Sequence, residues 1–413
     1  ERVVVPSHTA IPGLYGNEGN VDDWVRLKRE VLVLGEKKSL SARPNGRSSD
    51  WIAPSTANGC AMACSYCYVY EHADQSWRGR PATMAPDVWQ AVLHGLTRHV
   101  RRHDLRGLRI VLHGGEPLLL GADRLGALAA DLRAAVPATC TVDIGLQTNG
   151  VLLDAAILAA LRRHGVRVGV SMDGTPADHD RHRVRPGGRG TAAAVARALD
   201  LLRRPENRAA YAGILCTVSP RTDPVAVLHH LRGYDPPMID FLLPHATWAD
   251  PPPHPLGDWL VAAFDAWYDS AGPPPVRLFD DVIALLLGRP GRTEHLGLSP
   301  VALAVVETDG AIELVDALKS AYDGACATGL DIRRDELDDL MTDPGYAARQ
   351  IGRAALSPTC LTCPVQQVCG GGHYVHRYRP GAGFRNPSVY CADLRRLIEH
   401  VRSRITADLR VTG

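Results

Sequence analysis

The sequence predicts an α/β protein in which parallel strands alternate with helices, and two observations lead to this fold class. Six short apolar or β-branched runs recur between residues 51 and 246, and the stretches between them carry apolar residues at helical spacing. Such strand–helix–strand units cross over in the right-handed sense and form a full or partial barrel, or an open doubly wound sheet. The expected strands are 51–55, LRIVLHGG, TVDIGLQTN, VRVGVSMDG, AGILCTVS and MIDFLLPHA.

Three helices are expected between the first strands, because apolar residues recur there every three or four positions. Pro86 suits the first turn of the first of them, and Gly165 suits the C-cap of the third. A further short helix is expected earlier, over VDDWVRLKREVLVL. The apolar faces of the first two helices comprise Trp89, Val92, Leu93, Leu96 and Val100, and Leu125, Leu128, Leu132 and Val136.

The distinctive residues of the chain follow the expected strands. In α/β sheets of this kind, ligands bind at the carboxyl ends of the strands. GGEP, TNG, SMDG, TVSP and PHATW follow strands two to six, and a loop with three cysteines follows strand one. We therefore expect these segments to meet at one rim, where they form the functional site.

Composition narrows the class of protein. The chain has 413 residues, of which 45% are hydrophobic and 22% charged, and its formal net charge is +1. This near-neutral charge argues against a nucleic-acid partner, and the lack of an 18-residue apolar run argues against a membrane span. The start, ERVVVPSHTA, lacks the apolar stretch of a secretion signal, so a cytoplasmic protein is expected. We expect an N-terminal segment of unknown role over 1–50, a barrel over 51–290 and a loop-rich domain over 291–413.

The ten cysteines are clustered, which favours metal binding over disulfides. Cys60, Cys64 and Cys67 form a C-x3-C-x2-C loop, whose three thiolates can bind three irons of a cubane cluster and leave the fourth iron open. A zinc site with a distant fourth ligand, or three buried thiols, is the alternative. A second group comprises Cys360, Cys363, Cys369 and Cys391, whereas Cys140 and Cys216 are expected to pack in the core and Cys326 is unassigned.

The three-cysteine loop, with an aromatic residue before its third cysteine, resembles the signature of the radical S-adenosylmethionine (SAM) superfamily. HGGEP, QTNG and SMDG, which is followed by an arginine, resemble further motifs of that superfamily. The resemblance implies a partial (β/α)6 radical SAM barrel. It also implies a 4Fe–4S cluster that binds SAM through its open iron and cleaves it to a 5′-deoxyadenosyl radical. The residues that it implies for cofactor binding are Tyr66, Gly114, Gly115, Glu116, Gln147, Asn149, Ser171 and Arg183, with Gln147 placed toward the substrate.

CLTCPVQQVCGGGH, with Cys391 beyond it, resembles the SPASM extension of radical SAM peptide maturases. Such extensions usually carry seven cysteines for two auxiliary clusters, but here His373 and Val315 stand near positions where cysteines are usual. The four remaining thiolates suffice for one closed auxiliary 4Fe–4S cluster, and a structural zinc site is the alternative. CYVYEHADQSW, GILCTVSP, DFLLPHATW and NPSVYCADL further resemble the FxsB-type subfamily.

The resemblance implies a maturase of a ribosomally made precursor peptide, supplied with electrons by a flavodoxin or ferredoxin. The expected reaction is a cyclophane-forming cross-link between an aromatic ring carbon and the β-carbon of a nearby residue, with loss of two hydrogens. An auxiliary cluster could accept the electron that is released, and a rim residue must accept the proton. Asp240, His245 and Asp280 are candidates for the proton acceptor by position, and a structural role is the alternative for His245. His373, His376 and Arg377 could contact the peptide or support the cluster.

Three alternatives remain open at this point. One is another radical SAM peptide modification: thioether formation, epimerisation, hydroxylation or sulfatase maturation. A second is an enzyme like spore photoproduct lyase, suggested by APSTANGC before the cysteines. The third is a zinc-stabilised peptide-binding protein without catalysis, which iron content would distinguish from an iron–sulfur enzyme.

Overall fold

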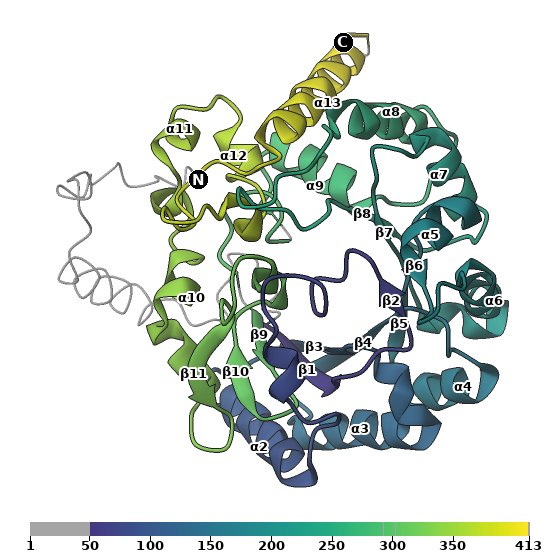
Figure 1. The fold of residues 1–413 in the computed structure, drawn as a ribbon, viewed down its shortest axis with the longest axis vertical. Helices are drawn as coiled ribbons and strands as arrows, with labels where there is room; N and C mark the ends of the chain where they lie inside the picture. The colour runs from purple at the N-terminus through teal and green to yellow at the C-terminus, as the bar shows by residue number, and fades with distance from the viewer. Residues whose placement is uncertain (1–49, 292, 302, 412–413) are drawn as a thin grey trace.

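A computed structural model describes residues 50–291, 293–301 and 303–411 of the chain. The helix expected over 21–34 lies outside the described residues. The expected α/β fold is confirmed: six parallel strands, with helical structure between them, form the central part of the main sheet. Figure 1 shows these strands as an arc with the helices outside it, and the loop that follows the first strand crosses the middle of the view.

The main sheet has nine strands in the order β11-β10-β9-β1-β3-β4-β5-β7-β8. Strands β1, β3, β4, β5, β7 and β8 pair in parallel, each with the next. Strand β9 pairs in parallel with the other edge of β1, whereas β10 pairs antiparallel with both β9 and β11. A separate antiparallel pair joins β2 to β6. The strands are β1 Asp50–Ala57, β2 Ala63–Cys64, β3 Gly107–Gly114, β4 Thr141–Thr148, β5 Arg167–Ser171, β6 Arg183–Val184, β7 Tyr211–Thr217, β8 Ile239–Leu242, β9 Leu303–Val306, β10 Ala311–Glu313 and β11 Ala327–Asp331.

The helices cover the outside of the strands, and three short 3-10 turns lie near the site. The α-helices are α2 Pro86–Arg102, α3 Gly121–Ala135, α4 Ala155–Arg163, α5 Pro176–His182, α6 Ala192–Leu202, α7 Pro224–Arg232, α8 Gly257–Tyr268, α9 Arg277–Leu286, α10 Pro344–Ala348, α11 Pro358–Leu361, α12 Gln366–Cys369 and α13 Cys391–Val411. The 3-10 turns are η2 Pro117–Leu120, η4 Asp316–Ser320 and η7 Tyr374–Arg377.

Local chemistry explains where the first helices begin and end. Pro86 occupies the first turn of α2, where its missing N–H costs nothing. The side chain of Asp154 caps α4 by accepting a hydrogen bond from the Ile157 amide. Gly165 follows α4 with a φ of 61°, the left-handed conformation expected for a residue just past a helix end. The two expectations from the sequence, for Pro86 and Gly165, are confirmed.

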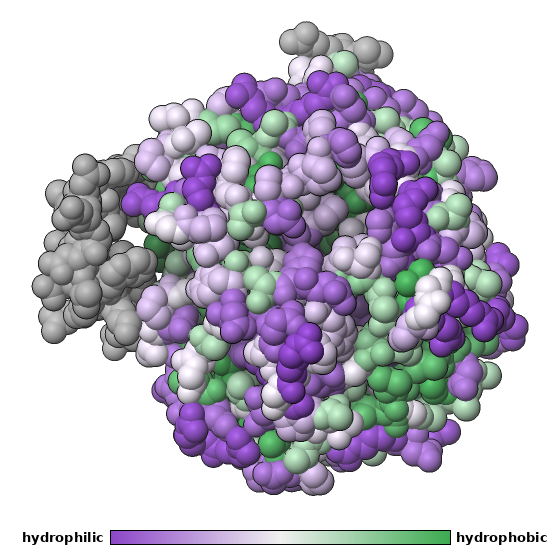
Figure 2. Space-filling model, in the orientation of Figure 1, coloured by the Kyte–Doolittle hydropathy of each residue, from purple (hydrophilic) through white to green (hydrophobic). Residues whose placement is uncertain are grey.

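The core lies between the strands and the helices. Along β3, Leu108, Ile110 and Leu112 are buried in alternation with less buried residues, as the period of a strand requires. The apolar faces expected for α2 and α3 are buried against this sheet. Figure 2 shows polar and apolar residues mixed over the face that is viewed in Figure 1, with a hydrophobic area over α3 and α4.

The C-terminal part continues the same sheet and also packs on the barrel helices. Strand β9 pairs with β1, and α13 lies beside α8. The carboxylate of Asp393, in the first turn of α13, accepts hydrogen bonds from the amides of Leu256 and Gly257 at 2.7 Å and so caps α8. No helix among the described residues is long and apolar enough to cross a membrane.

Candidate functional site

The three-cysteine loop follows β1 and is fixed to the barrel by backbone contacts. Cys64 lies in β2 and pairs with Arg183 in β6, and the amide of Ser65 donates to the carbonyl of His182 at 3.1 Å. Cys60, Cys64 and Cys67 are all half-buried. Burial raises the pKa of each thiol, to about 11 for Cys64. The thiols therefore stay protonated at neutral pH until a metal displaces the protons.

The thiols of the loop influence one another's pKa. The charges of Cys67 and Cys60 add to the rise in the pKa of Cys64, and the charge of Cys67 adds to the rise in the pKa of Cys60. The three sulfurs therefore lie near one another, as the ligands of one metal centre do.

The GGE segment brings backbone and a carboxylate close to this loop. Gly114 has a φ of 136°, and a Cβ there would collide with the carbonyl of Ala57. A Cβ on Gly115 would collide with the hydroxyl of Tyr70 and the carbonyl of Gly59. Only glycine therefore allows the end of β3 to approach the start of the cysteine loop.

The carboxylate of Glu116 is buried and held in one orientation. Its Oε1 accepts from the amide of Leu118 at 3.0 Å and the hydroxyl of Thr148 at 2.6 Å, and its Oε2 accepts from the amide of Asn149 at 2.8 Å. Burial raises the pKa of Glu116, and these hydrogen bonds work against that rise. Because Oε2 accepts only one of these bonds, it keeps lone-pair capacity for a further donor, such as an ammonium group.

Residues at the ends of β4 and β5 complete this side of the rim. The side-chain amide of Asn149 lies 3.6 Å from the sulfur of Cys60. Gln147 donates to the hydroxyl of Ser171 at 3.0 Å, so these two expected residues form a pair. The GGE, QTN and SMDG segments are therefore neighbours in space, because they stand at the ends of the adjacent strands β3, β4 and β5.

Arg183 and Tyr66 form a buried polar group behind the loop. Arg183 donates to the hydroxyl of Tyr66 at 2.7 Å, and that hydroxyl donates a short hydrogen bond to Asp173. Burial lowers the pKa of Arg183, but the charges of Tyr66, Asp173 and Cys64 outweigh burial and raise it, so the guanidinium stays charged. The Nε of Arg183 and the hydroxyl of Tyr70 are buried without a hydrogen-bond partner. Such orphaned donors beside the three thiols fit a site built for a polar cofactor.

The second cysteine group lies where α11, α12 and α13 meet. Cys360 is in α11, Cys369 ends α12, Cys391 begins α13, and Cys363 lies between the first two. Burial raises the pKa of Cys369 to about 12, and the charges of Cys391 and Cys360 add to the rise. This mutual influence indicates that the sulfurs converge. The thiol of Cys326 instead contacts the carbonyl of Val315 at 3.4 Å, and Cys140 and Cys216 are buried in the core.

Arg377 fixes the loop that connects Cys369 to His373. Its buried guanidinium donates to the carbonyls of Gly370, Gly371 and Gly372 at 2.6, 3.1 and 2.7 Å. All three glycines are in the left-handed region, with φ of 60°, 82° and 70°. The GGG sequence is therefore needed for the conformation of this loop.

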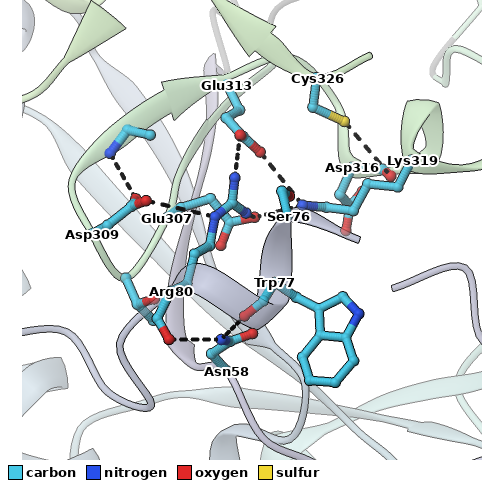
Figure 3. Close-up of polar contacts among 12 residues, drawn as sticks. Asn58, Ser76, Trp77, Arg80, Glu307, Asp309, Glu313, Asp316, Lys319 and Cys326 are labelled. Atoms are coloured by element: carbon cyan, nitrogen blue, oxygen red, sulfur yellow. Dashed lines mark hydrogen bonds and ion pairs between the residues drawn. The ribbon is translucent and has the colours of Figure 1, made fainter. Parts of the chain in front are cut away.

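An ion-pair network that the sequence analysis missed joins the cysteine loop to the C-terminal part (Figure 3). Arg80, which follows the loop, pairs with Glu307 and Glu313, and Lys319 pairs with the same two carboxylates at 3.0 and 3.4 Å. The Arg80, Glu307, Glu313 and Lys319 side chains are each less than 10% exposed. No motif could reveal this network, because Arg80 lies more than 220 residues before Glu307, Glu313 and Lys319 in the sequence.

A second set of residues was also missed. His113 Nε2 lies 2.8 Å from Asp316 Oδ2, and the hydroxyl of Tyr68 lies 2.7 Å from the same oxygen and 3.2 Å from the same nitrogen. Burial lowers the pKa of His113, but Asp316 outweighs burial and raises it above its ordinary value. Burial acts to raise the pKa of Asp316, but its hydrogen bonds with His113 and Tyr68 hold it low. The HGG motif pointed to His113, whereas nothing in the sequence marked Asp316.

The three residues expected as proton acceptors lie in different surroundings, and their roles remain predictions. Asp240 is buried in β8 and paired with Arg277. Asp280 lies in the first turn of α9. His245 packs edge-on against Tyr68, with ring centroids 4.9 Å apart, and burial lowers its pKa to about 3. His373 and His376 lie beside His245, with ring centroids 5.7 and 6.0 Å away.

Comparison with known proteins finds a family that this arrangement resembles. Residues 55–207 match the model of the Radical SAM superfamily. Over these residues the chain has a segment similar to the radical SAM domain. It contains the three-cysteine loop, the GGE segment and Arg183, whose geometry fits the 4Fe–4S cluster and SAM that radical SAM enzymes use. The four-cysteine group lies outside the matched residues.

Two solved structures resemble the whole fold. The structure described as native anSMEcpe with bound AdoMet has a TM-score of 0.74 and 20% identity, over 87% of this chain and 98% of that chain. The structure described as native anSMEcpe with bound AdoMet and Kp18Cys peptide has a TM-score of 0.73 and 21% identity, with the same coverage. These likenesses show that the shared fold covers most of the chain, including much of the C-terminal part.

The curated relatives of the chain include sulfatase-maturating enzymes. A serine-type anaerobic sulfatase-maturating enzyme from Klebsiella aerogenes is 35% identical over 150 residues, which are 35% of this chain and 34% of the relative. A cysteine-type enzyme from Clostridium perfringens (strain 13 / Type A) is 24% identical over 275 residues, 62% of this chain and 71% of the relative. The chain thus spans about a third of the length of the first relative and most of the second.

Proposed function

We propose that this chain is a radical SAM enzyme that modifies a ribosomally made peptide and forms a cyclophane in it. The observation that carries the proposal is the position of the three-cysteine loop beside Glu116, Asn149 and Arg183, at the carboxyl ends of the parallel strands. When bound, the reduced cluster and SAM supply a radical that removes a hydrogen atom from a β-carbon. A peptide substrate is supported by the fold shared with a structure described with a bound peptide.

Different residues of the chain would bind SAM and the auxiliary cluster. Glu116 offers a fixed acceptor to the SAM ammonium, and Arg183 and Ser171 offer donors to its carboxylate. Cys360, Cys363, Cys369 and Cys391 would hold one closed auxiliary cluster, which leaves no open iron for the substrate. The joined product lacks two hydrogens: one is removed as an atom by the radical, and the other leaves as a proton, which a base at the rim takes, and as an electron, which the auxiliary cluster would accept.

We propose that His113, and not Asp240, His245 or Asp280, accepts the proton that the aromatic ring loses. Its raised pKa makes it a better base than His245 near neutral pH, and Asp316 would stabilise the imidazolium that forms. His113 is the last residue but one of β3 and directly precedes the GGE segment, so it lies at the rim where the substrate must bind. Asp240 already forms an ion pair with Arg277.

Formylglycine formation, as in sulfatase maturation, is the second candidate, and the curated relatives favour it. Oxidation of a serine to formylglycine also removes two hydrogens, so mass alone does not separate the two reactions. Cyclophane formation is favoured by the FxsB-type motifs and by the single four-cysteine group. An aldehyde-reactive probe distinguishes them, because formylglycine reacts and a cyclophane does not.

The test is anaerobic incubation of reconstituted protein with SAM, dithionite and the precursor peptide encoded beside it, with a sulfatase-derived serine peptide in parallel. We expect the precursor to lose two hydrogens without aldehyde reactivity, and we expect fragmentation to be suppressed inside the ring. An aldehyde on the sulfatase peptide alone would establish the second candidate instead. If iron-replete protein produces no 5′-deoxyadenosine while the Cys60→Ala variant behaves identically, the radical SAM activity itself is refuted.

A further inference from the structure

Three histidines from distant parts of the chain meet beside the barrel mouth. His245 follows β8, whereas His373 and His376 belong to the loop and the short η7 turn after the four-cysteine group. One nitrogen atom from each imidazole lies within 4.8 Å of a nitrogen of each of the other two. The three ring pairs are inclined to one another by 44°, 52° and 85°, so none of the rings is stacked on another.

Two of these histidines have ring nitrogens that are buried without the hydrogen bonds that burial normally requires. The Nδ1 of His245 and both nitrogens of His376 are inaccessible to solvent and have no hydrogen-bond partner. Burying an imidazole nitrogen without a partner costs free energy, and native structures contain few such groups. Three of them in one place indicate a missing shared partner. Burial also lowers the pKa of His245 to about 3 and that of His376 well below its ordinary value, which leaves their lone pairs free to bind a cation.

The surroundings hold the rings in place. His373 Nε2 lies 3.5 Å from Glu294, and Glu294 is itself paired with Arg349. A carboxylate beside one imidazole nitrogen is the usual partner that orients a metal-binding histidine. His376 packs against Tyr390 at 4.9 Å, and the hydroxyl of Tyr390 donates to the carbonyl of Pro244, next to His245.

We propose that His245, His373 and His376 bind one divalent first-row transition-metal ion, separate from both cysteine groups. Three neutral imidazoles are the ligand set that zinc and similar ions take, and they leave at least one coordination position open. Because His245 belongs to the barrel and the other two to the C-terminal part, the ion would also link these two parts. This site lies beyond the proposed function and does not depend on the reaction that the enzyme performs.

The other histidine group of the described residues provides a matched control. His99, His103 and Asp338 also bring their ligand atoms within 4.8 Å of one another. There, however, Asp338 lies 3.0 Å from His99 and 2.9 Å from His103, so the carboxylate already partners both rings. Loss of His103 should therefore leave zinc binding at the proposed site unchanged.

The test measures zinc binding to cluster-loaded holoenzyme, in which iron and sulfide occupy the cysteines. The holoenzyme is incubated anaerobically with zinc sulfate, gel-filtered, and analysed for zinc and iron by mass spectrometry. We expect the wild-type protein and His103→Asn to retain about one zinc per chain. We expect His245→Asn and His376→Asn to bind zinc at least ten times more weakly while they keep the iron content of the wild type. Zinc should also raise the thermal unfolding midpoint of the wild type but of neither of these variants.

Two results would overturn the proposal. One is wild-type holoenzyme that retains no zinc, nickel, cobalt or copper. The other is zinc retention by His245→Asn and His376→Asn that equals that of the wild type. If His376→Asn loses iron as well, His245→Asn decides the question, because His245 lies in the barrel and outside the loop that carries the cysteines.

Discussion

Replacing Arg377 by methionine should release the GGG loop and the auxiliary cluster while sparing the SAM site. The guanidinium satisfies three buried carbonyl groups, those of Gly370, Gly371 and Gly372. Each buried acceptor left without a donor costs about 1–3 kcal/mol, so the sum is about 3 kcal/mol or more. Methionine fills similar space without a charge, which recovers part of the cost of burying the guanidinium.

The assay is anaerobic denaturation by guanidinium chloride, together with iron analysis. We expect a lower midpoint at an unchanged m-value. We also expect about four of eight irons to be lost, because the loop follows directly from the ligand Cys369. Arg402→Met, at an exposed position of α13, is the control and should change stability by less than about 0.5 kcal/mol. An Arg377→Met protein with full iron and a midpoint equal to that of the control would refute this account of the loop.

Three further predictions follow from the site. Cys60→Ala should abolish 5′-deoxyadenosine formation, whereas Cys360→Ala should lose about four irons and still form it; equal loss in both would contradict two separate sites. Asp316→Asn should lower peptide product about 100-fold relative to 5′-deoxyadenosine. Because Asp316 raises the pKa of His113, which must be neutral to accept a proton, this variant should also shift the acid limb of the pH–rate profile to lower pH; an unmoved limb would exclude His113. Lys319→Met should destabilise the protein by about 3–5 kcal/mol in chemical denaturation, since Glu307 and Glu313 then share only Arg80, and adding Glu313→Gln should restore part of the loss.

The fold and the rim could be predicted because their signals are local. Strands such as β3 and β4 are short runs in which buried apolar residues alternate with less buried ones, and GGE and QTN stand at their carboxyl ends. The strand order then brings those motifs together without further information. The histidine group could not be predicted, since His245 and His373 are separated by more than a hundred residues and neither belongs to a motif with an implied partner. The Tyr68–His113–Asp316 contact and the Arg80 network were missed for the same reason.

The pairing of β9 with β1 determines when the barrel can be completed during synthesis. Strand β1 carries the chain directly into the three-cysteine loop, yet one of its edges is covered only when residues 303–306 arrive. An uncovered edge strand pairs readily with other chains, and contacts between residues so far apart in sequence form slowly. A nascent chain that has released only the barrel residues therefore still exposes the strand that leads to its cofactor site. A protein truncated before β9 would keep this edge exposed and should aggregate when expressed.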